Sequence, residues 1–221
     1  MTNKAKPVEK PKVKKAYSYG DIQKRKFKTL NLTGEWLEHI GKPERSGSWV
    51  AYGYSGNGKT SYEMQLAKML CGHEKVHINT LEEGMRQSFL DALNRNNMAS
   101  VKNRFTFQSE TYDELWKRLD RKRQPKIVFI DSLQYFFRRK RLDHYFELLE
   151  YFNDTLFIFM AHSLKGGQIK GSIAEDILYH SDCKLYIKDF VCEVQTSRYG
   201  GSKPFVIYEE GAKQRQVKLL S

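Results

Sequence analysis

The stretch Gly53-Tyr54-Ser55-Gly56-Asn57-Gly58-Lys59-Thr60 decides how the rest of this chain is interpreted. It fits the pattern G-x-x-x-x-G-K-[ST], in which a glycine-rich loop wraps backbone N–H groups around a phosphate chain. The glycines leave room where a Cβ atom would intrude. In this pattern Lys59 reaches the β- and γ-phosphates, and the Thr60 hydroxyl binds Mg²⁺. The sequence therefore predicts a phosphate cradle over residues 53–61, with Ser61 as its last member.

The residues on both sides of the loop have the character that such a cradle requires. Residues 48–52 form a short run with high strand propensity, and residues 61–70 are rich in helix formers. Strand, loop and helix thus follow in the expected order. A flexible glycine-rich turn that binds nothing is the alternative, and this context argues against it.

Composition limits the class of protein. The chain has 221 residues, enough for one α/β domain with a substantial core. Its 38 Lys and Arg exceed its 26 Asp and Glu, so the net charge is +12. This excess indicates a polyanionic partner, nucleic acid first and an anionic membrane surface second, with a merely solvated basic surface as the alternative.

Hydropathy and cysteine content indicate the cellular compartment of the protein. No apolar window approaches 18 residues and the basic start lacks an apolar core, so we expect neither a membrane span nor a secretory signal. The three cysteines, Cys71, Cys183 and Cys192, have no C-x-x-C or metal spacing. Buried free thiols in a reducing compartment are the expectation, and we therefore predict a cytoplasmic protein.

The chain divides into a basic tail and one domain. Residues 1–28 hold ten Lys or Arg and two acids, and their low hydrophobicity predicts disorder over the first fifteen or so residues. The tail could be a nucleic-acid arm, an arm that docks on a neighbour, or a solubilising end. Residues 29–221 are expected to form a single domain, in which residues 29–47 supply a short amphipathic helix before the first strand.

From residue 48 onward, apolar runs alternate with amphipathic ones. Strands are predicted at 48–52, 75–79, 104–107, 127–130 and 155–161, and helices at 61–70, 84–94, 112–119, 142–152 and 173–179. Three later runs look like strands joined by tight turns, at 184–187, 191–196 and 204–208. We expect an α/β fold with a mostly parallel twisted sheet, helices on both faces and a C-terminal antiparallel extension. Ligands bind such sheets at the carboxyl ends of the strands.

Polar residues that follow the predicted strands are candidates for chemistry on a nucleoside triphosphate. Asp131 closes the apolar run 127–130, where an acid linked to Mg²⁺ is required, although a helix cap is the alternative. Glu82 and Glu83 follow the second strand. We favour Glu82 as the base that polarises water, with Glu83 as a competitor and helix N-terminal acids as the alternative.

His162 follows the strand at 155–161, where it would face the γ-phosphate and report its presence to the next loop. A simple turn residue is the alternative. Lys59, Glu82 and His162 thus form the predicted catalytic set within one chain. The absence of an N-K-x-D base-recognition motif favours ATP over GTP.

These strand-end groups together resemble the RecA-like P-loop ATPases, and most closely the ATPase cores of bacterial RadA and the DnaB-type helicases. Residues 161–171, AHSLKGGQIKG, look like the G-H-V-T-K-E-G-x-x-x-G of RadA. Residues 80–83 look like the S-L-E-M of DnaB and the paired Glu of the KaiC group. Residues 197–200 resemble the end of the K-N-R-F-G of RadA. The likeness covers roughly residues 48–210.

The resemblance implies a homo-oligomer, ring or filament, with ATP between subunits. Arg198 matches the arginine that reaches the γ-phosphate of a neighbour, whereas Thr196 stands where the family has a lysine. The chain also lacks the Cys-rich finger and the protease-like domain of RadA. The oligomer is therefore expected to be built from a bare ATPase core.

The resemblance also implies that DNA lies along the loops after two of the strands. The first, residues 135–141, interleaves aromatics with four consecutive cations, Arg138, Arg139, Lys140 and Arg141. Bases can stack on aromatic faces while cations follow phosphates. A buried aromatic stretch beside a solvated charge run is the alternative. The second loop carries Lys165 and Lys170 among glycines, which suits phosphate contact without sequence readout on single- or double-stranded DNA.

Three functional hypotheses follow. The first is a DNA-dependent ATPase of recombination, repair or replication. The second is a nucleotide-controlled accessory or loader protein for a helicase or recombinase. The third is a KaiC-like signalling ATPase. ATP hydrolysis with and without single-stranded DNA separates them.

Overall fold

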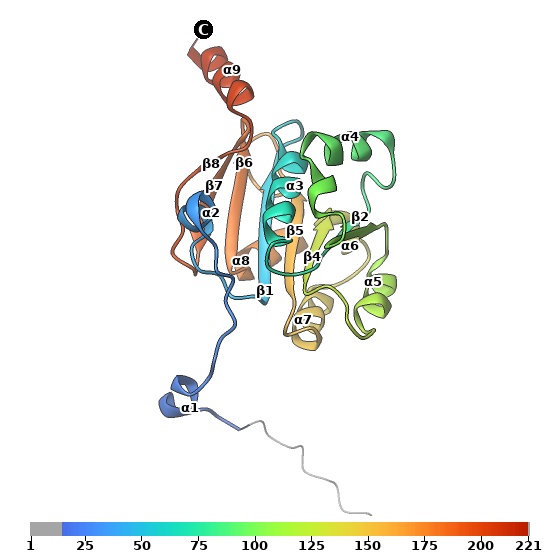
Figure 1. Ribbon diagram of the computed structural model, residues 1–221, viewed down its shortest axis with the longest axis vertical. Helices are drawn as coiled ribbons and strands as arrows, with labels where there is room; N and C mark the ends of the chain where they lie inside the picture. The colour runs from blue at the N-terminus through green and yellow to red at the C-terminus, as the bar shows by residue number, and fades with distance from the viewer. Residues whose placement is uncertain (1–14, 221) are drawn as a thin grey trace, which may run out of the picture.

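A single sheet of eight strands runs through the molecule (Figure 1). This computed structural model describes residues 15–220, and the side chains of residues 15–215. The strands are β1 (Gly47–Gly53), β2 (Val76–Thr80), β3 (Phe105–Gln108), β4 (Ile127–Asp131), β5 (Leu156–His162), β6 (Cys183–Lys188), β7 (Val191–Ser197) and β8 (Phe205–Val206). Their order across the sheet is β3-β2-β4-β5-β1-β6-β7-β8. The strands from β3 to β6 in this order are parallel, and β7 and β8 continue the sheet in antiparallel pairing.

Helices connect the strands and cover both faces of the sheet (Figure 1). In the described residues they are α1 (Tyr19–Gln23), α2 (Gly34–Ile40), α3 (Lys59–Leu70), α4 (Gln87–Arg95), α5 (Tyr112–Leu119), α6 (Leu133–Phe136), α7 (Leu142–Tyr151), α8 (Ser172–His180) and α9 (Glu209–Leu220), with a 3₁₀ turn at Met98–Val101. None of these helices is long and apolar enough to cross a bilayer.

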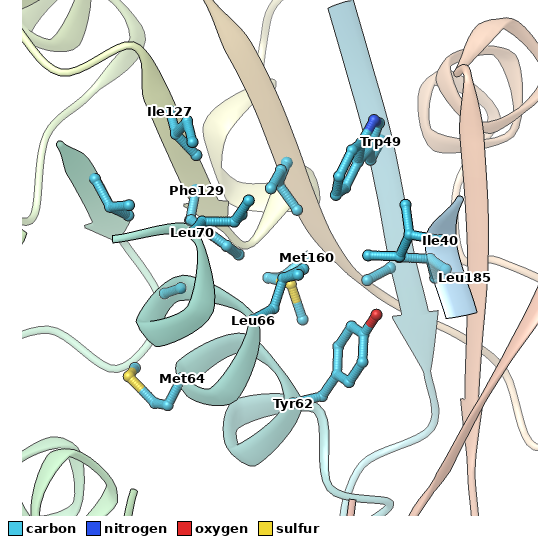
Figure 2. Packing of buried hydrophobic residues seen from close by; sticks show 14 of the residues in the cluster. Ile40, Trp49, Tyr62, Met64, Leu66, Leu70, Ile127, Phe129, Met160 and Leu185 are labelled. Carbon is cyan, nitrogen blue, oxygen red and sulfur yellow. The ribbon is translucent and has the colours of Figure 1, made fainter. Parts of the chain in front are cut away.

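The core consists of two apolar layers, one on each face of the sheet. Because successive side chains on a strand point to opposite faces, Ile127 and Phe129 join one layer while Val128 and Ile130 join the other. Figure 2 shows the first layer, in which Tyr62, Leu66 and Leu70 of α3 pack over the central strands. Continuous apolar runs are thus buried on both faces, as parallel strands between helices require.

The expected α/β class, with a mostly parallel sheet and an antiparallel C-terminal extension, is confirmed. Some predicted boundaries are wrong. The helix expected at 84–94 begins only at Gln87, and the last strand is limited to Phe205–Val206.

Three helices in the structure were not predicted from the sequence. They are α1, α6 and α9. Helix α1 lies inside the segment expected to be a basic tail, where Ser18 and Asp21 form a reciprocal capping box. Helix α9 carries Glu209 and Glu210 in its first turn, which favours a helix start there. Most of the tail expected to be disordered lies outside the described residues.

Helix α1 lies apart from the body of the molecule, at the end of an extended segment (Figure 1). It buries none of its residues. Four large hydrophobic side chains of this arm are exposed: Tyr17, Tyr19, Ile22 and Phe27. These side chains of the arm, residues 15–28, are therefore not packed on the domain, and the arm joins it at Lys28, whose carbonyl accepts a hydrogen bond from the Arg45 N–H at 2.8 Å.

Candidate functional site

The glycine-rich loop between β1 and α3 forms one wall of a cavity of about 430 Å³. The other walls come from the carboxyl ends of β2, β4 and β5 and from the turn after β2. The lining residues are Ser55, Gly56, Gly58, Lys59, Thr60, Ser61, Glu63, Glu82, Glu83, Arg86, Ser88, Asp131, Met160 and His162. Nearly every catalytic, cofactor-binding and metal residue predicted from the sequence lies at this cavity or in its loop, with Arg198 as the exception.

Two glycines give the loop its shape for different reasons. Gly58 ends the loop in the left-handed region, with φ of 97°, and is the N-cap of α3. A Cβ atom at Gly53 would collide with the backbone carbonyl of Ile187 on the neighbouring strand. The first N–H groups of a helix have no intrahelical partner, and in α3 no side chain caps them either. Such an uncapped N-terminus beside a cavity is suited to bind an anion.

The turn between β6 and β7 holds the loop in place. The Asn57 side chain accepts a hydrogen bond from the Asp189 backbone N–H at 2.8 Å and donates one to the Tyr54 carbonyl at 3.1 Å. The Phe190 N–H also donates to the Asn57 carbonyl at 3.2 Å. Sequence reasoning missed this role of Asn57, because its partner lies 132 residues away.

Lys59 lies partly buried at the start of α3, and its ammonium donates to the Tyr54 carbonyl at 3.2 Å. Burial lowers the pKa of Lys59, while the charges of Asp131 and Glu82 oppose that shift. The ammonium is therefore hydrogen-bonded to its own loop and is also attracted by the charges of Asp131 and Glu82. A phosphate chain in the cavity would offer it a stronger partner than a backbone carbonyl.

Asp131 ends β4 and is paired in register with Thr80 at the end of β2. Burial raises the pKa of Asp131 to about 7, the charge of Glu82 adds to this rise, and Lys59 opposes it. Lys59 alone thus does not compensate the negative charge that Asp131 has in its carboxylate form. A divalent cation would supply the missing positive charge.

Glu82 and His162 are brought together although they lie 80 residues apart. His162 Nε2 is 2.6 Å from Glu82 Oε2. The backbone N–H of Glu82 donates to the Asp131 carbonyl at 3.2 Å, which ties the turn after β2 to the end of β4. Glu83 lines the same cavity, so both candidate bases remain near the reacting position.

Glu63 is a site residue that sequence reasoning missed. It lies in α3, is 1% exposed, and lines the cavity. Its Oε1 has no hydrogen-bond partner among the described residues. Burial raises the pKa of Glu63 far above the usual range, and Asp131, Glu83 and Glu82 add to the rise. The available signal was an acid at the third position after Thr60, between the apolar-faced residues Tyr62 and Met64.

The donor set fits a hydrated Mg²⁺ ion held together with phosphate oxygens. Among residues 15–215, no group of three His, Cys, Asp or Glu side chains is placed to hold an ion alone. Mg²⁺ is commonly bound by one or two carboxylates, several waters and substrate phosphates. The Thr60 hydroxyl and the Asp131 carboxylate would hold it, and the unpartnered Glu63 oxygen marks a missing neighbour in the same cavity.

Arg198 does not reach the site of its own chain. It follows β7, whose last residue Ser197 pairs with Cys183 at the amino end of β6. Gly53 instead pairs with Ile187, close to the carboxyl end of β6. Arg198 thus lies at the end of the strands opposite the cavity. Its side chain is 68% exposed, and its Nε is 3.5 Å from Asp182 Oδ1. Arg198 therefore has no place in the cavity of its own chain.

The loop after β4 differs from the expected stacking platform. Phe136 and Phe137 are each 3% exposed and belong to the core, so the prediction that they stack on bases is wrong. Tyr135 remains 50% exposed. Lys140 is bound to Asp113 at 2.9 Å, which reduces its availability to phosphate. The three arginines of this segment, Arg138, Arg139 and Arg141, are exposed.

The loop after β5, residues 163–171, presents Lys165 and Lys170 to solvent. Gln134 of α6 connects this loop to the cavity, and sequence reasoning missed it. Its Nε2 donates to the Lys170 carbonyl at 2.9 Å, and its Oε1 accepts from the His162 N–H at 3.2 Å. One side chain thus bridges the two predicted DNA loops and contacts the histidine of the cavity.

A larger cavity, of about 1010 Å³, lies at the other end of α3, between α2 and the 3₁₀ turn. Its lining includes none of the site residues predicted from the sequence. The larger cavity also has charged residues in its lining, but only the smaller one combines the glycine-rich loop with several carboxylates. No protein-family model matches this chain, and no curated protein matches it. Its function is therefore inferred from its own residues.

Proposed function

We propose that this chain is a RecA-like P-loop ATPase that binds Mg·ATP, hydrolyses it, and acts on DNA without strong sequence preference as a homo-oligomer. One observation carries the proposal. An uncapped helix N-terminus with Lys59 and Thr60 faces Asp131 and Glu82 across a single cavity. Phosphoryl transfer requires hydrogen-bond donors that hold the phosphates, a positively charged side chain, and carboxylates for the metal ion and the attacking water.

The phosphate chain is bound by the loop and α3. The free N–H groups at the start of α3 donate to phosphate oxygens, and the Lys59 ammonium leaves the Tyr54 carbonyl to contact the β- and γ-phosphates. The Thr60 hydroxyl and Asp131 hold the divalent cation, which neutralises charge on the phosphate oxygens when it is bound. These contacts orient the γ-phosphate towards the end of β2.

Glu82 accepts a hydrogen bond from the attacking water and takes up its proton. His162 fixes the orientation of the Glu82 carboxylate through their 2.6 Å contact. A γ-phosphate in the cavity would compete with Glu82 for the imidazole. Binding of the triphosphate is thereby coupled to the position of the base, and Glu82→Gln stops turnover without preventing binding.

The basic loops are the proposed DNA surface. Exposed Arg138, Arg139, Arg141, Lys165 and Lys170 contact phosphates, and the net charge of +12 supports a polyanionic partner. Gln134 joins His162 to the carbonyl of Lys170. This bridge gives DNA a physical route to the nucleotide. The exposed Arg198, at the opposite edge of the sheet, supports an assembly in which it meets the nucleotide of a neighbour.

The test is ATP hydrolysis by the full chain, measured with and without single-stranded DNA at low and at moderate salt. We expect stimulation by DNA that declines steeply as salt rises, because binding depends on phosphate neutralisation. A rate that is indifferent to DNA at both salt concentrations would refute the DNA-dependent part. Calorimetry with Mg·ATP that registers no binding would refute the whole proposal.

The arm favours a second candidate, an accessory or loader protein for a helicase or recombinase. Its exposed Tyr17, Tyr19, Ile22 and Phe27 are unpacked on the domain, as a protein-docking element would be. In that function ATP hydrolysis responds to a protein partner instead of DNA. Deletion of residues 1–28 would then abolish the stimulation and leave the basal rate unchanged.

A further inference from the structure

Glu63 is the one carboxyl group of the cavity that has a fully buried oxygen without a hydrogen-bond partner in the described residues. Glu82 contacts His162, whereas Glu63 Oε1 has no hydrogen-bond partner and the residue is 1% exposed. Burying a carboxyl group without a partner is costly. An apolar side chain at this position would pack in α3 without that cost.

The neighbours of Glu63 make the cost greater. After burial, the charges that raise its pKa are those of Asp131, Glu83 and Glu82, all acids. Two cations line the cavity, Lys59 and Arg86; Lys59 donates to the Tyr54 carbonyl, and neither bonds to Glu63 Oε1. The protein by itself therefore offers Glu63 repulsion, and the favourable partner must come from a ligand that carries positive charge or hydrogen-bond donors.

The position of Glu63 indicates which ligand would be its partner, the hydrated divalent cation. It lies three residues after Thr60 in α3, and residues at this spacing share one face of a helix. Burial is the main cause of its raised pKa, and the charge of Asp131 is the next. Glu63 lines the same cavity as Thr60 and Asp131, the two groups that would hold the divalent cation. Because Mg²⁺ keeps several of its waters, protons of those waters need acceptors near this point.

We propose that Glu63 is a positioning residue for the divalent cation of the nucleotide site, and that its carboxylate accepts hydrogen bonds from water in the shell of the ion. The inference rests on the proposed function, since it requires the Mg·nucleotide complex. It adds a second carboxylate to that of Asp131, from the helix that follows the glycine-rich loop. Contact through water agrees with the absence of a three-residue ion cluster among residues 15–215.

The test compares Glu63→Gln with Glu83→Gln in the full chain. Both substitutions remove one carboxylate from the same cavity, but Glu83 is more exposed than Glu63. Mn²⁺ is titrated into each protein saturated with ADP, and free Mn²⁺ is followed by electron paramagnetic resonance. We expect Glu63→Gln to weaken Mn²⁺ binding by roughly 10- to 100-fold, the usual effect of an outer-shell substitution, and Glu83→Gln by less than about threefold.

ADP binding in EDTA separates this inference from the proposed function. We expect wild type and Glu63→Gln to bind metal-free ADP within about twofold of each other, because the phosphate cradle is unchanged. Equal Mn²⁺ affinity in wild type and Glu63→Gln would overturn the role of Glu63 while nucleotide binding stands. Failure of wild type to bind ADP with or without metal would instead overturn the nucleotide site itself.

Thermal unfolding without nucleotide excludes a structural role. Since a buried unpartnered carboxyl is costly, we expect Glu63→Met to melt at a higher temperature than wild type. Mg²⁺ and ADP together should raise the melting temperature of wild type more than that of Glu63→Met. A variant that melts below wild type without nucleotide would mean that Glu63 supports the fold, and the proposal would be wrong.

Discussion

Replacing Lys59 with methionine tests the phosphate cradle most directly. The substitution removes the only lysine that lines the cavity and keeps an unbranched side chain of similar length. In the structure the ammonium donates to the Tyr54 carbonyl at 3.2 Å. On nucleotide binding it would exchange this bond for contacts to the β- and γ-phosphates.

The expected loss follows from that exchange. Two charge-assisted hydrogen bonds contribute about 1.5–3 kcal/mol each, and the bond given up has the same charged donor and contributes a similar amount. The net loss is about 1.5–3 kcal/mol. At about 1.4 kcal/mol for each factor of ten, the Mg²⁺ complex of a non-hydrolysable ATP analogue should bind roughly 10- to 150-fold more weakly.

Isothermal titration calorimetry with the Mg²⁺ complex of a non-hydrolysable ATP analogue, which keeps the γ-phosphate, measures this loss without turnover. Lys68→Met is the matched control, because Lys68 lies on the same helix and also donates to a backbone carbonyl at 3.2 Å, that of Asn96. Lys68 lines the larger cavity, not the phosphate site. We expect the control to bind within about twofold of wild type. If Lys59→Met retained affinity within threefold, or if the control lost it instead, the cradle would be misassigned.

Four further outcomes are expected. Glu82→Gln should lower the turnover of ATP by roughly 10²- to 10⁴-fold with little change in affinity, and Glu83→Gln by much less; the reverse order in a steady-state assay would make Glu83 the base. Asp131, whose pKa lies at about 7 instead of 3.8, holds a proton in the folded state that the unfolded chain loses within this window. The free energy of unfolding without nucleotide should therefore fall as pH rises from about 4 to about 7, and Asp131→Asn should flatten that slope in urea titrations. Phe136→Ala should cost about 3–5 kcal/mol of stability because it opens a cavity in the core. Arg139→Ala should leave stability within about 0.5 kcal/mol but weaken DNA binding with a smaller salt slope, and equal salt slopes in fluorescence anisotropy would contradict its phosphate contact.

Much of the site could be predicted because its parts are local in the chain or lie at strand ends. The phosphate loop is eight consecutive residues whose glycines set the backbone shape. Asp131, Glu82 and His162 each follow an apolar run, and the carboxyl ends of parallel strands meet at one edge of a sheet. Periodicity and position along the chain were therefore enough to predict that these groups converge.

The basic aromatic segment after β4 shows where this reasoning fails. Tyr135, Phe136 and Phe137 are equivalent in a sequence pattern, yet only Tyr135 is exposed. A short helix, α6, turns the two phenylalanines into the core and leaves the tyrosine outside. Lys140 looked like its arginine neighbours until Asp113, 27 residues earlier, proved to lie beside it. Exposure and pairing of these residues depend on packing between distant elements.

The amino-acid sequence by itself determined the class of fold, the position of the glycine-rich loop and the acids at the strand ends, because glycine geometry and apolar periodicity act over a few neighbouring residues. Only the tertiary structure decided that Asn57 is held by the Asp189 turn and that Arg198 faces away from its own site. It also decided that the Glu63 carboxyl is buried without a partner. Burial, hydrogen-bond satisfaction and electrostatic neighbours arise when segments far apart in the chain meet, and no local pattern encodes which segments those are.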